Sequence, residues 1–154
     1  LKLMLLVSSN DSAQALAEFY GEKKFVERMN AKARELGMNE TNFSDSTGLS
    51  SLNQSTANDV KKLVARLASG YPKIFSLTAG KETVVKGKTF KNLHKFAGRK
   101  NFLGGKTGYL DEAKRNLVSL FLMPDGEKMI FVVLGSSDNF GDTERLLAKV
   151  NGHP

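Results

Sequence analysis

The segment Phe102–Tyr109 reads Phe-Leu-Gly-Gly-Lys-Thr-Gly-Tyr, a short extended run that is entered through two glycines. Two apolar runs follow it, Asn116–Met123 and Lys128–Leu134, and they are separated by Pro124-Asp125-Gly126. A Pro-Asp-Gly sequence between two apolar runs is a strong signal for a β-hairpin, because each of these residues favours a turn. The sequence therefore predicts a three-stranded antiparallel sheet with Phe102–Tyr109 as its first strand.

Helical patterns dominate the chain before this sheet. Apolar residues recur at helical spacing and the segments are separated by Gly, Asn, Ser and Thr, which cap and end helices. We expect the end of a buried helix at residues 1–7, a helix at 12–20 capped by Asn10 or Asp11, one at 22–36, and one that Ser55 or Thr56 caps and that ends at Ser69-Gly70. A hairpin with its turn at Gly87-Lys88 is expected over 81–90, and a final helix over 142–150.

This order of elements defines the expected fold class. Helices, then strands, then one helix favour an α+β fold in which helices cover an antiparallel sheet. At 154 residues the chain is predicted to be one domain over residues 1–154. Within it, the helical part should span about 1–72, the sheet part about 80–136 and the final helix about 142–150.

Composition excludes several functions. The chain has no cysteine, which removes disulfides, thiolate metal sites and cysteine nucleophiles. Its net charge is +7, its lysines are scattered without a run of five like charges, and no basic-aromatic motif indicates nucleic-acid binding. The apolar stretch Leu3–Val7 is far shorter than the ~20 residues that span a bilayer. No cofactor or metal is expected, and His94 and His153 are predicted to be surface residues.

Two tripeptides carry the chemistry. Lys106-Thr107-Gly108 is preceded far upstream by Ser8-Ser9-Asn10, which stands at a junction between two predicted helices. Ser-x-Asn followed by Lys-Thr-Gly, in that order, gives two of the three motifs of penicillin-binding proteins and serine β-lactamases. The other Ser-x-Asn matches fit less well, because Ser51–Asn53 lies in a loop before a helix and Ser137–Asn139 follows Lys-Thr-Gly. The third motif, Ser-x-x-Lys, is absent from this sequence.

Longer stretches strengthen the match. Leu5–Glu18, Phe25–Met38, Thr41–Leu49 and Gly104–Tyr109 resemble, in order, segments of the serine D-alanyl-D-alanine carboxypeptidases, the low-molecular-mass penicillin-binding proteins of peptidase family S11. The similarity runs from Leu3 to about Val150. It implies a β-lactamase/transpeptidase-like fold whose N-terminal part, with Ser-x-x-Lys, is missing from this sequence.

The resemblance assigns catalytic roles to three residues. Ser8 would relay a proton to the leaving D-alanine, and Asn10 would hold the substrate amide and the base lysine of the Ser-x-x-Lys motif. Lys106 would attract the terminal carboxylate of the substrate and support the proton path through Ser8.

The resemblance also implies a substrate-binding strand. Thr107 would hydrogen-bond the terminal carboxylate, and Gly108 would let the substrate lie close along the strand. The backbone N–H of Tyr109 would form half of the oxyanion hole. The expected partners are peptidoglycan peptides ending in D-Ala-D-Ala and β-lactam antibiotics.

Three interpretations follow. The first is a D-alanyl-D-alanine carboxypeptidase, extracytoplasmic and associated with the membrane, if at all, through segments outside this sequence; this chain alone should be inactive because it lacks the nucleophile. The second is a non-catalytic relative that binds peptidoglycan peptides. The third is a β-lactamase-like hydrolase, which the Ser-Ser-Asn-Asp sequence at Ser8–Asp11 favours less.

Overall fold

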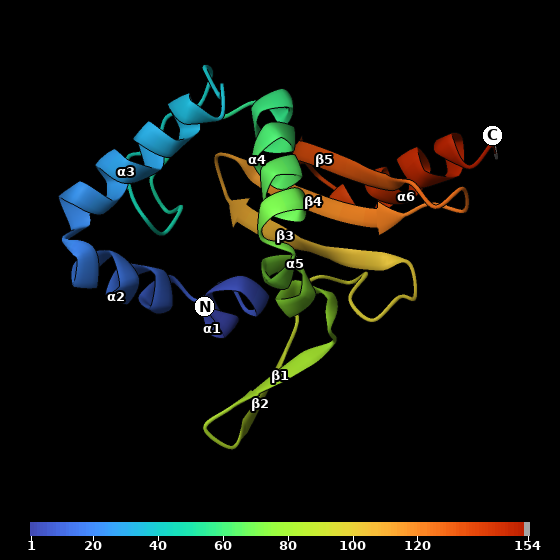
Figure 1. Cartoon of the computed structure of the whole chain (residues 1–154), viewed down its shortest axis with the longest axis horizontal. Helices are drawn as coiled ribbons and strands as arrows, with labels where there is room; N and C mark the ends of the chain where they lie inside the picture. Colours follow the sequence, from blue (N-terminus) through green and yellow to red (C-terminus); the bar gives the residue numbers. More distant parts are fainter. Residues whose placement is uncertain (153–154) are drawn as a thin grey trace.

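A computed structural model describes residues 1–152 and forms the elements in the order predicted (Figure 1). The helices are α1 (Lys2–Leu6), α2 (Asn10–Tyr20), α3 (Glu22–Glu35), α4 (Ala57–Gly70), α5 (Pro72–Ala79) and α6 (Asn139–Val150). The strands are β1 (Glu82–Val85), β2 (Lys88–Lys91), β3 (Phe102–Leu110), β4 (Lys114–Leu122) and β5 (Lys128–Ser136). The α+β class is confirmed.

The sheet is antiparallel in the order β3-β4-β5, as the sequence predicts. Alternate side chains of β4 enter two separate cores, because successive residues of a strand point to opposite faces. Leu117 and Phe121 pack with Leu147 of α6 on one face. Leu120 packs with Val64 of α4 and Phe75 of α5 on the other. Figure 1 shows α4 and α6 on opposite sides of the sheet.

Helix boundaries differ from the prediction where a cap was misassigned. Helix α2 begins at Asn10, because the side chain of Ser9 accepts the N–H of Ser12 and so caps the helix. The prediction of Asn10 or Asp11 as the cap was wrong. Thr56 caps α4 as expected, through the N–H of Asp59. Helix α6 starts at Asn139, three residues early, because Asp138 accepts the N–H of Gly141.

Helix α5 was not predicted, and it extends the helical part from about residue 72 to Ala79. Pro72 follows the end of α4 and is the first residue of a new helix, where proline is favoured because no N–H is needed there. This short helix packs directly on β3 and therefore helps to place the strand that carries Lys106.

The predicted hairpin is a separate two-stranded sheet, β1-β2, that projects from the rest of the molecule (Figure 1). Its turn lies at Lys86-Gly87, where both residues have positive φ, one position before the predicted Gly87-Lys88. No helix within residues 1–152 is both long and apolar enough to cross a membrane. The surface prediction for His153 lies outside the described residues.

Candidate active site

Lys106 of β3 contacts Ser8, which lies 98 residues earlier in the sequence. Its Nζ donates to the Ser8 Oγ at 2.7 Å and to the Thr107 carbonyl at 2.6 Å. Burial lowers the pKa of Lys106 to about 8, so the amine is mostly protonated at neutral pH. In residues 1–152 no carboxylate forms a salt bridge with this lysine. Its positive charge is therefore directed at the cleft without being neutralised.

The two glycines before Lys106 allow β3 to pack closely against its supports. A Cβ on Gly104 would lie 2.5 Å from the Thr78 Oγ1 and 2.6 Å from the Phe75 carbonyl oxygen. A Cβ on Gly105 would lie 2.1 Å from the Val118 carbonyl oxygen and 2.7 Å from the His94 Nε2. Thr78 accepts the Gly105 N–H at 3.0 Å. Helix α5 and His94 thus fix the strand from behind.

Ser8 occupies the junction between α1 and α2. Its φ of 54° lies in the left-handed region, which is strained for a residue with a side chain. Ser9, next along, is used as the cap of α2. This arrangement leaves the Ser8 hydroxyl directed at Lys106 and keeps the carboxamide of Asn10 out of the helix cap.

All six predicted site residues line one cleft, with a volume of about 820 Å³. Ser8 and Asn10 lie on one wall, and Lys106, Thr107, Gly108 and Tyr109 lie on the other. Strand β3 pairs with β4 along one edge only, within the part of the chain that the structure describes. The cleft therefore runs along an open strand edge, which an extended peptide can join by backbone hydrogen bonds.

The loop Ser46–Leu49 also lines the cleft, and sequence reasoning missed the residue that shapes it. Asp45 accepts the N–H groups of Thr47, Gly48 and Ser50 at 2.7, 2.5 and 2.5 Å. It also accepts the Asn53 amide at 3.1 Å. Although burial acts to raise the pKa of Asp45, these hydrogen bonds lower it overall. An Asp followed by Ser, Thr and Gly is a turn signal that could have identified it.

His94 is a buried residue, so its prediction as a surface residue was wrong. Only 3% of it is exposed, and its ring lies 4.4 Å from that of Phe102. The Nε2 lies 3.1 Å from the Val118 carbonyl oxygen and 3.2 Å from the Ser119 Oγ. Burial lowers its pKa to about 4, and the charge of Lys106 contributes to that shift. His94 is therefore a neutral support behind β3.

The cleft is cationic. Its lining residues within the described chain include Lys95, Lys106 and Arg115 and contain no Asp or Glu. The Arg115 guanidinium lies 5.3 Å from the centre of the Tyr109 ring, and the Lys95 Nζ 5.1 Å from that of Phe140. Residues 1–152 contain no cluster of three or more potential metal ligands. An anionic ligand suits this site.

A second cavity, of about 450 Å³, lies between α3 and α4. Its lining is mainly apolar and includes Phe25, Met29 and Leu63. It offers no hydroxyl paired with an amine, unlike the cleft at Ser8 and Lys106. The cationic cleft is therefore the candidate active site.

Fold and site together define a class. A solved structure of penicillin-binding protein D2 from Listeria monocytogenes, in its cefotaxime-bound form, matches with a TM-score of 0.89 and 28% identity. The match covers 98% of this chain and 64% of that one. The fold is thus that of the penicillin-binding proteins, a transpeptidase-like fold.

The sequence comparisons identify a family within this class. The family model described as D-alanyl-D-alanine carboxypeptidase, Peptidase S11, matches residues 1–138, and the chain belongs to this family. The D-alanyl-D-alanine endopeptidase of Escherichia coli K12 is 35% identical over 95% of this chain and 51% of its own length. The D-alanyl-D-alanine carboxypeptidase DacF of Bacillus subtilis 168 is 33% identical over 89% and 37%. The chain spans about half the length of these relatives, or less.

Proposed function

We propose that this chain forms one part of the active site of a D-alanyl-D-alanine carboxypeptidase that acts on peptidoglycan stem peptides. The observation that carries the proposal is the 2.7 Å contact of the Lys106 Nζ with the Ser8 Oγ beside an open strand edge. The nucleophilic serine and its base lysine come from polypeptide outside these 154 residues. Because the substrate lies in the cell wall, the location proposed is extracytoplasmic.

The substrate binds as an added strand along β3. The positive charge of Lys106 and the hydroxyl of Thr107 hold the terminal carboxylate of the peptide, and a substrate carboxylate raises the pKa of the lysine again. Gly108 has no side chain to obstruct the peptide. The N–H of Tyr109 stabilises the negative charge that develops on the scissile carbonyl oxygen.

The reaction proceeds in two steps. The base lysine, which Asn10 helps to position, takes the hydroxyl proton of the nucleophilic serine; the serine oxygen bonds to the carbonyl carbon of the penultimate D-alanine, and the C–N bond to the last D-alanine breaks. Ser8 passes a proton to the departing amine and is reprotonated by the base lysine or by Lys106. Water then hydrolyses the ester and restores the serine.

Intact-mass measurement after incubation with a reactive penicillin tests this proposal. The complete gene product is expected to gain the mass of one penicillin, and the 154-residue chain none. Lys106→Ala in the complete product should slow the labelling by about 100-fold or more, which is the typical scale for loss of a group that stabilises charge. Absence of any adduct on the complete product would overturn the proposal and favour a non-catalytic peptide-binding relative.

A second candidate activity is endopeptidase cleavage, which the Escherichia coli relative's name suggests. The volume of the cleft, about 820 Å³, and the additional lining residues Lys95 and Phe140 favour it, because a cross-linked substrate has a larger leaving group than D-alanine. The two activities separate when the complete gene product is given a monomeric pentapeptide and a cross-linked dimer in parallel. Release of D-alanine from the monomer supports the carboxypeptidase, and cleavage of the dimer alone supports the endopeptidase.

A further inference from the structure

The excess of positive over negative charge in this chain arises in one segment. The segment from Lys81 through Lys106, both included, contains eight lysines and arginines and one acidic residue, Glu82. The difference equals the net charge of the whole sequence, +7, so the basic and acidic residues elsewhere balance. The net positive charge of the chain therefore lies in this segment.

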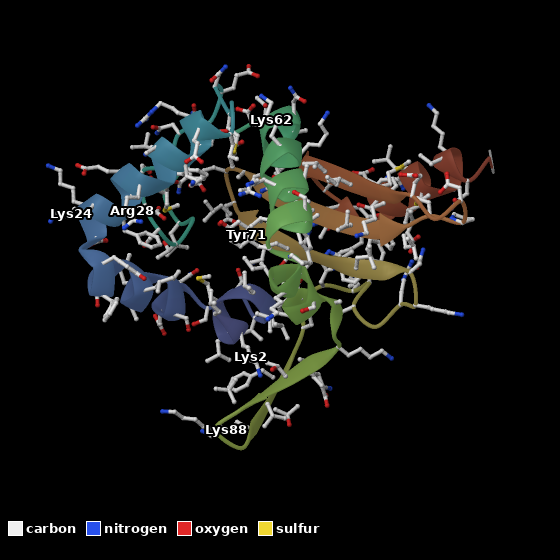
Figure 2. All side chains as sticks on the ribbon, in the orientation of Figure 1. Lys2, Lys24, Arg28, Lys62, Tyr71 and Lys88 are labelled. Atoms are coloured by element: carbon white, nitrogen blue, oxygen red, sulfur yellow. The ribbon has the colours of Figure 1, made fainter. Side chains whose placement is uncertain are left out.

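Much of this segment is the projecting hairpin, residues 82–91, here termed the basic arm. Lys86, Lys88 and Lys91 are exposed on it, and Lys81 is exposed at its base. Figure 2 shows Lys88 at the outer end of the arm, with Lys2 of α1 on the same side of the molecule. Helix α1 packs against both strands of the arm and so ties it to the junction that carries Ser8.

Few of these charges are neutralised within the chain. Arg99 forms an ion pair with Glu144, and Glu82 lies opposite Lys91 in the β1-β2 ladder. Among the other basic residues of the segment, none forms a salt bridge within residues 1–152. The arm itself therefore has a net charge of +2, from Lys86, Lys88 and Lys91 against Glu82, and it is held in place by main-chain pairing.

The positive surface leads toward the catalytic cleft. The chain leaves the arm at Lys91, and Leu93 and Lys95 already line the cleft that contains Lys106. The Leu93 N–H donates to the Leu6 carbonyl at 3.1 Å, which fixes this connection to α1. Basic residues therefore lie both on the arm and in the cleft, and the described residues that line the cleft include no carboxylate.

We propose that the basic arm docks the anionic peptidoglycan polymer, so that the substrate of this site is the wall itself rather than free peptide. This inference rests on the proposed function. Peptidoglycan carries carboxylates along its stem peptides, and a basic surface raises the local concentration of such a polymer and speeds its encounter. A short peptide that fills only the cleft has no need of charges on the distant arm.

Co-sedimentation of the chain with peptidoglycan sacculi, freed of phosphate-containing polymers, tests the inference. The arm variant Lys86→Gln/Lys88→Gln/Lys91→Gln is compared with Lys23→Gln/Lys24→Gln/Lys61→Gln, which removes the same charge from exposed positions on α3 and α4. The arm variant should bind about tenfold more weakly at low salt, and the control within about twofold of wild type. Salt should reduce the difference, since it screens exposed charges.

Equal binding by the two variants would overturn the inference. So would an arm effect that appears on vesicles containing phosphatidylglycerol but not on sacculi, which would assign the arm to a membrane surface. Circular dichroism confirms that both variants fold. Failure of the proposed function shows itself separately, as absence of a penicillin adduct on the complete gene product, whether or not the chain binds sacculi.

Discussion

The two walls of the cleft are built by different physical means. Strand β3 is fixed by close packing: Gly105 lies directly against His94 and the Val118 carbonyl, in a layer that excludes water. On the opposite wall, the loop Ser46–Leu49 is fixed by polar contacts near the surface, most of them to Asp45. Close packing fixes the strand that carries Lys106, whereas the polar wall is held by hydrogen bonds that water can replace.

Because of this difference, the two walls should tolerate different kinds of substitution. A packed position fails when volume is added, because neighbouring atoms have nowhere to move. A hydrogen-bonded loop fails when acceptors are removed, because its N–H groups must find other partners. The following changes probe each wall in turn.

Gly105→Ala should have the largest effect. The added Cβ would lie 2.1 Å from the Val118 carbonyl oxygen, which belongs to the β4 backbone and cannot move without breaking the ladder. We expect a loss of about 3 kcal/mol or more in the free energy of unfolding. Urea denaturation followed by circular dichroism measures it.

Gly108→Ala on the same strand is the matched control. Its Cβ would meet Asn116 at 3.6 Å, an ordinary contact, so stability should remain close to that of wild type. The same variant should weaken peptide binding, since the methyl group projects into the cleft. Equal stability of the two variants would show that β3 is not fixed by packing.

Asp45→Ala tests the polar wall. The substitution removes the acceptor for three backbone N–H groups and the Asn53 amide. We expect a loss of about 2 kcal/mol, which is less than the separate bonds would sum to because exposed N–H groups can turn to water. Thermal unfolding measures the stability, and hydrogen exchange at Thr47, Gly48 and Ser50 should speed up. Unchanged exchange would contradict the role given to Asp45.

Sequence reasoning located the polar residues that line both walls better than the residues that support them. Lys106 and Ser8 were recognised because their motifs are local, and the structure brings them into contact. Asp45 was missed although its turn signal is local, because the loop was recognised as a whole. His94 was misplaced because nothing in Asn-Leu-His-Lys indicates burial; its place depends on aromatic rings that come from residues 96, 102 and 140.

The elements show the same limit. The three strands were predicted because their apolar runs are bounded by glycine and by Pro124-Asp125-Gly126. Helix α5 was missed because Pro72 can end one helix or begin another, and only packing against β3 distinguishes the two. The excess of positive charge from Lys81 to Lys106 contains no run of five like charges, and its lysines form one surface only when the arm folds.

Thr78→Val removes a single support from the packed wall while keeping its shape. Thr78 is 4% exposed, and its hydroxyl accepts the Gly105 N–H at 3.0 Å. The buried N–H would lose its partner, at an expected cost of about 1 kcal/mol. Thr78→Ser, which retains the hydroxyl, should recover most of the loss on the same urea measurement. If the valine and serine variants are equally stable, the hydrogen bond does not position β3.

The last prediction is a pH dependence that reports on Lys106 alone. Burial lowers its pKa from 10.5 to about 8, so between these values the unfolded chain binds a proton that the folded chain does not. Stability should therefore rise with pH over this interval, because folding no longer buries a charge that water would solvate. Below pH 8 both states are protonated and the penalty is constant. Lys106→Met should abolish this contribution. From pH 8 to 10.5 the wild type should therefore become more stable relative to the variant. If the difference in unfolding free energy between wild type and Lys106→Met does not change with pH, the amine is solvated in the folded chain. Burial would then not lower the pKa of Lys106.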